Sequence, residues 1–440
     1  MGIVPCPLTC HTDNESESNS NQQQQQQLLH SESSTSLSSQ PSLPSIPSLN
    51  PQGSQRHHHH HYTTPPTTYH CISTLKAHSS YVFSLALAGK FLYSGSSDRE
   101  IRSWPRHPLS NPNSSPSSSN NIVAVGKGAV KSLVISGDKL FSAHQDHKIR
   151  VWRINNNNQH LNNSSYHQSM YKLIATLPTL SDRVLRLLLP NNHVQVRRHK
   201  KCTWVHHVDT ISALALSHDG SLLYSVSWDR TFKLWRTSDF KCLESVSNAH
   251  DDAINALALS NDGYLYTGSA DTKIKVWGKL SDHKKHSLVA TLEKHKSAVN
   301  ALALTTDGSV LYSGACDRSI VVWEKDSSAA ATGGDGGGHM VVVGALRGHT
   351  KAILCLSVVS DLVCSGSADK TVRIWRRSVE KSYYCLAVLE GHGGPVKCLT
   401  AAIDRYDSLT TSSAYTTSYL VYSGSLDCDI KVWQILVPSP

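Results

Sequence analysis

A repeated unit is the strongest constraint on how this 440-residue chain can fold. The segments DTISALALSHDGSLLYSVSWDRTFKLW (209–235), DAINALALSNDGYLYTGSADTKIKVW (252–277) and SAVNALALTTDGSVLYSGACDRSIVVW (297–323) are visibly alike. Seven times an Asp precedes a Trp by six residues, and a Ser or Thr precedes that Asp by four: Ser94, Asp98, Trp104; Ser142, Asp146, Trp152; Ser225, Asp229, Trp235; Thr267, Asp271, Trp277; Ser313, Asp317, Trp323; Ser365, Asp369, Trp375; Ser423, Asp427, Trp433. A fixed period of this kind indicates a repeat architecture rather than unrelated domains.

Each unit has the pattern of a small antiparallel sheet. An apolar strand is followed by a polar or Asp-Gly turn, a second strand, a turn that contains the Asp, and a third strand that carries the Trp. A single four-stranded sheet cannot cover both of its own faces, so seven of them are expected to close a ring. The predicted fold is all-β, a seven-bladed propeller over residues 70–440, in which the strand around Cys71–Leu75 completes the last blade and removes the sheet edge.

A histidine stands four residues before the first strand in six of the repeats: His78, His207, His250, His295, His349 and His392. The second repeat has Gly126 at this place. His, Ser or Thr, Asp and Trp at these spacings resemble the buried tetrad of WD40 repeats. A catalytic site occurs once, whereas this set recurs with the fold, so we expect a structural network and no enzymatic activity, metal or cofactor.

Residues 1–69 have the composition of a disordered tail, with Gln22–Gln27, His57–His61 and dense Ser, Asn and Pro. The tail contributes −3 (four acids, one base) to the net charge of +9, which leaves +12 on residues 70–440. The chain has eleven Cys without a CxxC motif, no signal peptide and no apolar run of membrane-spanning length. We therefore expect a protein of the cytoplasm and nucleus that is not attached to a membrane.

Several segments interrupt the repeats. Segments 105–121, 154–170, 325–340 and 401–418 are polar and are interpreted as solvated spacers on the face opposite the His and Asp turns. The segment 178–206 differs, because it is apolar, basic and aromatic and joins the second and third blades on the His/Asp face. A hairpin that turns at Pro190–Asn192 is predicted there, either as a cover over the blade top or as a recognition arm.

The Trp228-Asp229 pair raises the question of which Trp belongs to the fold. Asp229 takes the tetrad place and Trp235 is the repeat Trp, which leaves Trp228 as an additional residue. In WD40 propellers the partner-facing positions come third and fifth after the His and just before the tetrad Asp. These positions carry the large or charged side chains Tyr81, Phe83, Lys131, Gln145, Trp228 and Lys397 on blades 7, 1, 2 and 3, beside Arg197, Arg198, Lys200, Lys201 and Trp204 of the insertion.

The stretches VQVRRHKKCTW, SVSWDRTFKLWRTSDFKCLES and NAHDDAINALALS resemble a narrower set of proteins, the plant JINGUBANG-like WD40 group. This resemblance implies a protein-binding adaptor in transcription-linked signalling, similar to a negative regulator of pollen germination that acts with a TCP-class transcription factor. One alternative is an RNA or acidic-ligand binder that uses the basic residues 197–201, although nucleic acid is the less favoured partner. Another is a ubiquitin-ligase substrate receptor, which the absence of Trp-Asp-x-Arg at every repeat Trp disfavours.

Overall fold

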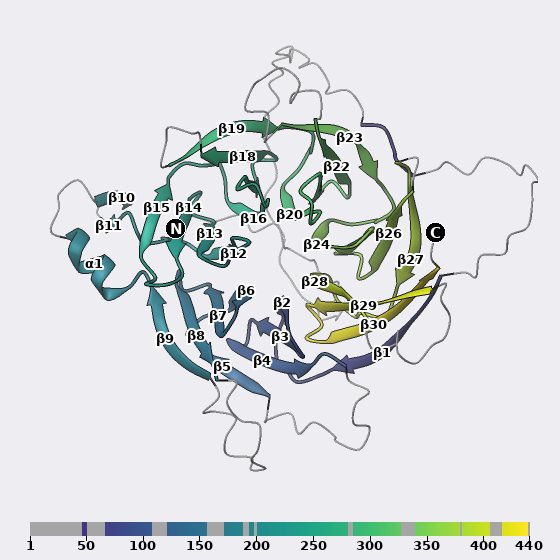
Figure 1. Ribbon diagram of the computed structural model, residues 1–440, viewed down its shortest axis with the longest axis horizontal. Helices are drawn as coiled ribbons and strands as arrows, with labels where there is room; N and C mark the ends of the chain where they lie inside the picture. Colours follow the sequence, from purple (N-terminus) through teal and green to yellow (C-terminus); the bar gives the residue numbers. More distant parts are fainter. Residues whose placement is uncertain are drawn as a thin grey trace, which may run out of the picture. The chain divides into compact units, whose positions relative to one another are not determined.

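The computed structural model describes residues 46–50, 67–107, 121–155, 171–187, 193–197, 200–279, 285–326, 339–378, 381–404 and 416–438. Within residues 45–440 they form seven four-stranded antiparallel sheets arranged as a ring (Figure 1). The predicted seven-bladed propeller is confirmed. Its sheets are β2(Val82–Ala88)–β3(Phe91–Ser96)–β4(Glu100–Pro105)–β5(Ile122–Val125), β6(Val130–Ser136)–β7(Lys139–His144)–β8(Ile149–Ile154)–β9(Tyr171–Leu177), β12(Ile211–Leu216)–β13(Leu222–Ser227)–β14(Phe232–Arg236)–β15(Cys242–Val246), β16(Ile254–Leu259)–β17(Leu265–Ser269)–β18(Ile274–Lys279)–β19(His286–Leu292), β20(Val299–Leu304)–β21(Val310–Ala315)–β22(Ile320–Lys325)–β23(Met340–Leu346), β24(Ile353–Val359)–β25(Leu362–Ser367)–β26(Val372–Arg377)–β27(Tyr383–Leu389) and, for blade 7, β28(Val396–Ile403)–β29(Thr416–Ser425)–β30(Ile430–Pro438)–β1(Thr68–Leu75).

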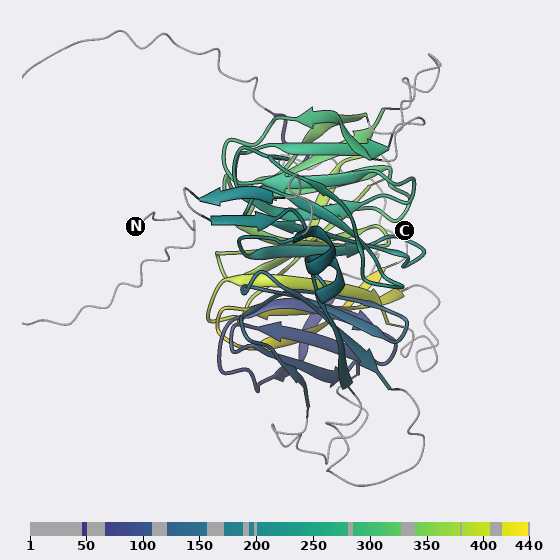
Figure 2. The ribbon, with the colours of Figure 1, turned by 90° about the vertical axis from the view of Figure 1, so that its left-hand side faces the viewer.

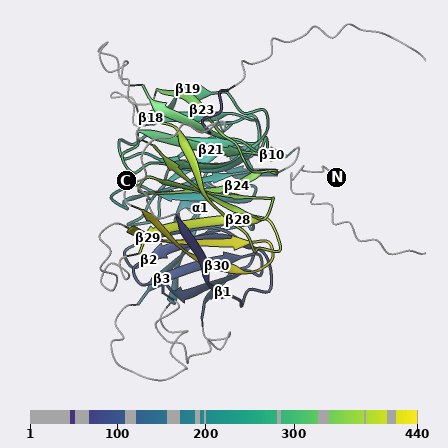
Figure 3. The same ribbon diagram turned by 90° about the vertical axis from the view of Figure 1, so that its right-hand side faces the viewer.

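The two ends of the ring meet in blade 7. Strand β1 pairs antiparallel with β30, from Thr68 opposite Leu436 to Leu75 opposite Ile430, and the two lie side by side in Figure 3. The closing strand was expected around Cys71–Leu75 and begins earlier, at Thr68. A strand contributed from the start of the domain closes the sheet, so the ring has no open end.

The core lies between neighbouring blades rather than at the centre of the ring. At the seam between blades 7 and 1, Val82 and Leu92 pack with Leu420 and Tyr422, and all four residues are fully buried. A Cβ at Gly424 would come within 2.8 Å of Val82, so glycine allows the blades to approach closely there. Apolar faces on both sides of each blade explain why the inner strands read as almost unbroken apolar runs.

The segment between blades 2 and 3 differs from its prediction. It contains a helix, α1 (Leu180–Leu187), followed by a hairpin of β10 (His193–Arg197) and β11 (Lys200–Thr203). The hairpin turn therefore falls between Arg197 and Lys200, and the expected turn at Pro190–Asn192 is wrong. The helix begins where the Thr179 hydroxyl accepts a hydrogen bond from the Asp182 amide at 3.2 Å, the arrangement of an N-cap.

The expected tail and spacers also contain ordered ends. Ile46–Asn50 lie against blade 5. The prediction that residues 1–69 are disordered is therefore wrong for these five residues. Residues 401–403 and 416–418, assigned to a spacer, extend strands β28 and β29. The central parts of the four spacers lie outside the described residues. No helix in the described part of the chain has the length and apolar character needed to cross a membrane.

Candidate functional site

The His, Ser or Thr, Asp and Trp side chains meet in six blades. In each, His Nδ1 lies 2.8–3.1 Å from the Asp Oδ2, and His Nε2 lies 2.8–2.9 Å from the hydroxyl oxygen. The Trp indole N–H donates to the same hydroxyl at 2.8–2.9 Å. Both ring nitrogens of each His are thus engaged. Such a ring cannot also serve as a free base, and its role is to tie the segment before the inner strand to the second and third strands of the blade.

The tetrad carboxylates are strongly biased toward the charged form. Burial raises the pKa of Asp317, but hydrogen bonding to His295 and the charge of that ring outweigh it, so the pKa lies well below its usual range. The pKa of Asp369 and that of Asp427 are lowered in the same way by His349 and His392. A network of this kind stabilises the fold at neutral pH and weakens when acid protonates the carboxylates.

Blade 2 builds a different network. A Cβ at Gly126 would lie 2.5 Å from the ring of His144, a residue of strand β7 whose ring occupies the space that the missing His leaves. His144 Nε2 lies 2.8 Å from the Ser142 hydroxyl and its Nδ1 3.0 Å from the Gly128 carbonyl oxygen. Asp146 pairs instead with Arg150, with Oδ1 to Nη1 at 3.1 Å. His144 stands where most blades have Ser, so the spacing of the repeat did not predict its role.

Four of the predicted partner-facing residues form one cluster on the His/Asp face. The Lys131 ammonium lies 3.7 Å from the centroid of the Phe83 ring and 5.9 Å from that of Trp228, within cation–π range of both. Tyr81 packs edge-on against Phe83, with ring centroids 6.4 Å apart, and is 49% exposed. We call Tyr81, Phe83, Lys131 and Trp228 the aromatic arc. It spans blades 1, 2 and 3.

The backbone holds the arc in place. The Trp228 amide donates to the Thr210 carbonyl at 3.0 Å, and the Ser97 amide donates to the Tyr81 carbonyl at 2.9 Å. Trp228 is half-buried, as are Phe83 and Lys131. Side chains presented from hydrogen-bonded turns lose little conformational freedom on binding, which favours recognition.

The other predicted residues have different surroundings. Gln145 is exposed on the same face. Lys397 lies near the buried thiols of Cys355 and Cys398 in blades 6 and 7; burial raises the pKa of both thiols, and the charge of Lys397 opposes this in part. Trp204 packs against the apolar cluster between blades 2 and 3, so it supports the core.

Three of the four predicted basic residues of the insertion, Arg197, Lys200 and Lys201, lie in the strands of the β10–β11 hairpin. Arg198 lies outside the described residues, and only the backbones of the other three are described. In Figure 2 the strands β10 and β11 project beyond one face of the disc. This is the His/Asp face. The hairpin belongs to the connection from β9, the outer strand of blade 2, to β12, the inner strand of blade 3, and such connections run across the His/Asp face.

Helix α1 does not lie over the blade top, and that interpretation of the insertion is wrong for the helix. The buried Asp182 carboxylate accepts a hydrogen bond from the Cys242 amide at 2.9 Å, which places α1 beside β15, the outer strand of blade 3. In Figure 1 the helix lies at the circumference of the ring. The outer strand has an unpaired edge, and the helix covers part of it.

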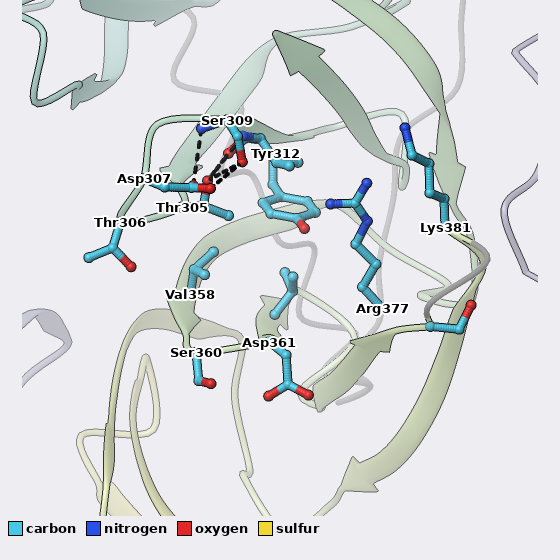
Figure 4. Close-up of a pocket in the computed structure, with 13 residues that line it drawn as sticks. Thr305, Thr306, Asp307, Ser309, Tyr312, Val358, Ser360, Asp361, Arg377 and Lys381 are labelled. Carbon is cyan, nitrogen blue, oxygen red and sulfur yellow. Dashed lines mark hydrogen bonds between the residues drawn. The ribbon is translucent and has the colours of Figure 1, made fainter. Parts of the chain in front are cut away.

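A cavity of about 820 Å³ lies between blades 5 and 6, at the end opposite the tetrads (Figure 4). Its charged groups are already paired. Lys381 Nζ donates to Glu324 Oε2 at 2.8 Å, and the Arg377 guanidinium donates to Glu324 Oε1. The Ser309 hydroxyl donates to Asp307 at 2.7 Å. These pairs satisfy the charged side chains that line the cavity, so we interpret the cavity as a structural cleft between two blades.

His78, Asp98 and Glu100 are close enough to resemble a metal site. However, His78 uses one nitrogen for Asp98 and the other for Ser94, and Glu100 accepts from the Arg102 guanidinium at 2.6 Å. No ligand atom of His78 is left for an ion. The group is a tetrad with an adjacent ion pair.

Comparison with known proteins agrees with this geometry. The family model described as WD domain, G-beta repeat matches residues 69–105, 199–236, 240–278, 286–324, 340–376 and 383–434, together more than half of the chain. Residues 106–198, which include blade 2 with its substituted network, lie outside the match.

Two curated relatives are similar over parts of the chain. An uncharacterized WD repeat-containing protein of Schizosaccharomyces pombe is 25% identical over 250 residues, which cover 50% of this chain and 65% of that protein. A probable cytosolic iron-sulfur protein assembly protein 1 of Chaetomium globosum is 35% identical over 122 residues, or 24% of this chain and 26% of that protein. The chain thus spans less than two thirds of either relative. The six matched repeats and the recurring tetrads show that this chain belongs to the WD-domain, G-beta repeat (WD40) family.

Proposed function

We propose that this chain is a non-enzymatic scaffold that binds a partner protein through the aromatic arc on its His/Asp face. The observation that carries this proposal is the Lys131 ammonium set beside the rings of Phe83 and Trp228. Aromatic and cationic side chains supply most of the energy of protein interfaces, and few residues suffice. WD40 propellers in general bind proteins and are typically not enzymes, which supports the same reading.

The uneven distribution of side chains supports the arc as the site. The corresponding positions of blades 4 to 6 carry mainly small side chains: Ala253, Asn255, Ala270, Ala298, Asn300, Cys316, Ala352, Leu354 and Ala368. Two of them are engaged within the ring, since the Asn255 and Asn300 amides donate to the carbonyls of Val299 and Ile353 at 3.1 and 3.0 Å. The arc offers the larger contact surface, and a fitting partner segment presents an apolar side chain to the rings and a carboxylate to Lys131.

The resemblance to the plant JINGUBANG-like group supports a regulatory setting. In this proposal the partner is a transcription regulator, such as a TCP-class factor, and the protein acts in the cytoplasm and nucleus. We do not propose a role in iron-sulfur protein assembly, because the match to that relative covers only 26% of its length. Binding of RNA or another acidic ligand through residues 197–201 is the competing function, and the experiment below separates the two.

The test compares the full chain with Trp228→Ala and with Phe91→Ala. Phe91 is the matched control, because it is an exposed aromatic of blade 1 at the end of the blade opposite the tetrads. Partners are recovered from plant reproductive tissue with each protein and identified by mass spectrometry, after equal melting temperatures have been verified.

We expect a transcription factor to bind the parent and Phe91→Ala, and to bind Trp228→Ala at least ~30-fold more weakly, the loss of a strong interface anchor. Equal capture by all three proteins would remove Trp228 from the site. Capture that nuclease treatment abolishes and that falls steeply with salt would support the RNA function instead.

A further inference from the structure

Five residues of the amino-terminal tail lie along the circumference of the propeller. Ile46–Asn50 run beside β23, the outer strand of blade 5, and Figure 1 shows this short purple segment next to β23. The Leu49 amide donates to the Ala345 carbonyl at 3.0 Å, and the Ala345 amide donates to the Pro47 carbonyl at 2.9 Å. The segment thus adds a parallel β-bridge to the edge of the sheet, and backbone pairing at a sheet edge is a mode by which proteins bind extended peptides.

Side chains and further backbone groups add specificity to this pairing. Leu49 packs against the apolar cluster between blades 5 and 6, and Ile46 packs against the cluster between blades 4 and 5. The Leu49 carbonyl accepts from the Tyr383 amide of blade 6 at 3.2 Å. The Asn50 side chain donates to the Arg347 carbonyl. The five residues thereby make hydrogen bonds with blades 5 and 6.

Blade 5 is adapted to receive Leu49. A Cβ at Gly344 would lie 2.5 Å from Leu49 Cγ and 3.0 Å from the Pro47 carbonyl oxygen, so only glycine leaves room for the segment. At the same register the outer strands of blades 2, 4 and 6 have alanine: Ala175, Ala290 and Ala387. A glycine costs stability inside a strand, and here it marks the close approach of another backbone.

We infer that the groove beside Gly344 is a binding site for extended peptides of the Pro-Ser-Leu-Asn type, and that Ile46–Asn50 is its tethered occupant. The tail carries three related triplets in succession, at 41–43, 44–46 and 47–49. A five-residue contact is weak on its own, and the tether of residues 51–67 raises its effective concentration to about the millimolar range. A partner that presents the same type of segment competes for the groove. This site lies on the circumference and is separate from the aromatic arc.

The experiment uses the full chain and a fluorescent peptide that spans residues 44–51. Three proteins are compared by fluorescence anisotropy: the parent, Leu49→Asp, and Leu49→Asp combined with Gly344→Ala. The first substitution places a charge against an apolar cluster and should release the tail segment from the groove. The second should close the emptied groove, and the alanines of the other blades indicate that the strand tolerates it.

We expect Leu49→Asp to bind the peptide about tenfold more tightly than the parent does, and about tenfold more tightly than the double variant does. A peptide with alanine in place of Leu49 should bind Leu49→Asp about tenfold more weakly than the original peptide. In the parent, the Ala345 and Tyr383 amides should exchange hydrogen more slowly than in Leu49→Asp. Absence of peptide binding by Leu49→Asp, or equal binding by all three proteins at matched melting temperatures, would overturn the inference.

Discussion

Replacing Gly126 by alanine should destabilise blade 2, and it should do so only while His144 is present. The new methyl group would lie 2.5 Å from the His144 ring carbon Cε1 and 2.7 Å from Nδ1. The ring is held by Ser142 and the Gly128 carbonyl, so it can move only by giving up these hydrogen bonds. Overpacking costs about 1–3 kcal/mol, and each of the two lost hydrogen bonds costs about 1 kcal/mol, which gives roughly 3–5 kcal/mol in total.

A second background isolates the cause. In His144→Ser the ring is absent, and serine is the residue that blades 1, 3 and 4 have at this place, as Ser96, Ser227 and Ser269. In that background Gly126→Ala should be neutral or stabilising by a few tenths of a kcal/mol, because alanine restricts the unfolded chain more than glycine does.

The free energies of unfolding of the four proteins, measured by urea denaturation with tryptophan fluorescence, form a double-mutant cycle. We expect a coupling of at least about 2 kcal/mol between positions 126 and 144. If Gly126→Ala costs the same in both backgrounds, His144 does not occupy the place of the missing tetrad histidine.

Three further predictions concern stability. Burial lowers the pKa of His144 from 6.5 to about 4, so the unfolded chain takes up this proton first; the free energy of unfolding should fall between about pH 6.5 and pH 4, by up to about 3 kcal/mol, and His144→Ser should lose this slope in urea titrations. Glu244→Ala should cost about 3–5 kcal/mol in the same assay, because Glu244 lies 2.8 Å from the buried His286 ring; Glu244→Gln should cost less. Asp182→Ala should release α1 from β15, which faster hydrogen exchange at the Cys242 amide would report while the melting temperature stays nearly unchanged.

The tetrads were predictable because their spacing is local. Asp and Trp on neighbouring turns and strands of one blade keep a constant separation in sequence, so a count of residues identifies them. The aromatic arc followed from the same register, since Tyr81, Phe83, Lys131 and Trp228 occupy fixed places relative to the tetrads. Because the repeat is regular, the position of a residue within its repeat predicts where that residue lies in its blade.

Departures from the repeat were harder to predict. The His144 ring fits in blade 2 because Gly126 has no side chain where the other blades carry the tetrad His. The two residues lie on different segments of the blade, so their relation is not visible in the local spacing of the sequence. The composition of residues 1–69 indicates disorder, while the docking of Ile46–Asn50 depends on the edge of β23 and on Gly344. Helix α1 did carry a local signal that was not used in the prediction: Thr179 is followed by Asp182 at the spacing of a capping box.

The most direct test of the aromatic arc as the partner-binding surface is site-specific photocrosslinking. A photoreactive phenylalanine analogue is placed at Tyr81 in one protein and at Phe91 in another, and each is irradiated with extract that contains the partner. The two positions are matched, since both are aromatics of blade 1 with 49% and 43% of their surface exposed, and they lie at opposite ends of the blade. We predict a defined crosslink to one protein from position 81 and none to that protein from position 91. A crosslink from position 91 alone, or equal crosslinks from both, would contradict the assignment of the binding surface to the His/Asp face.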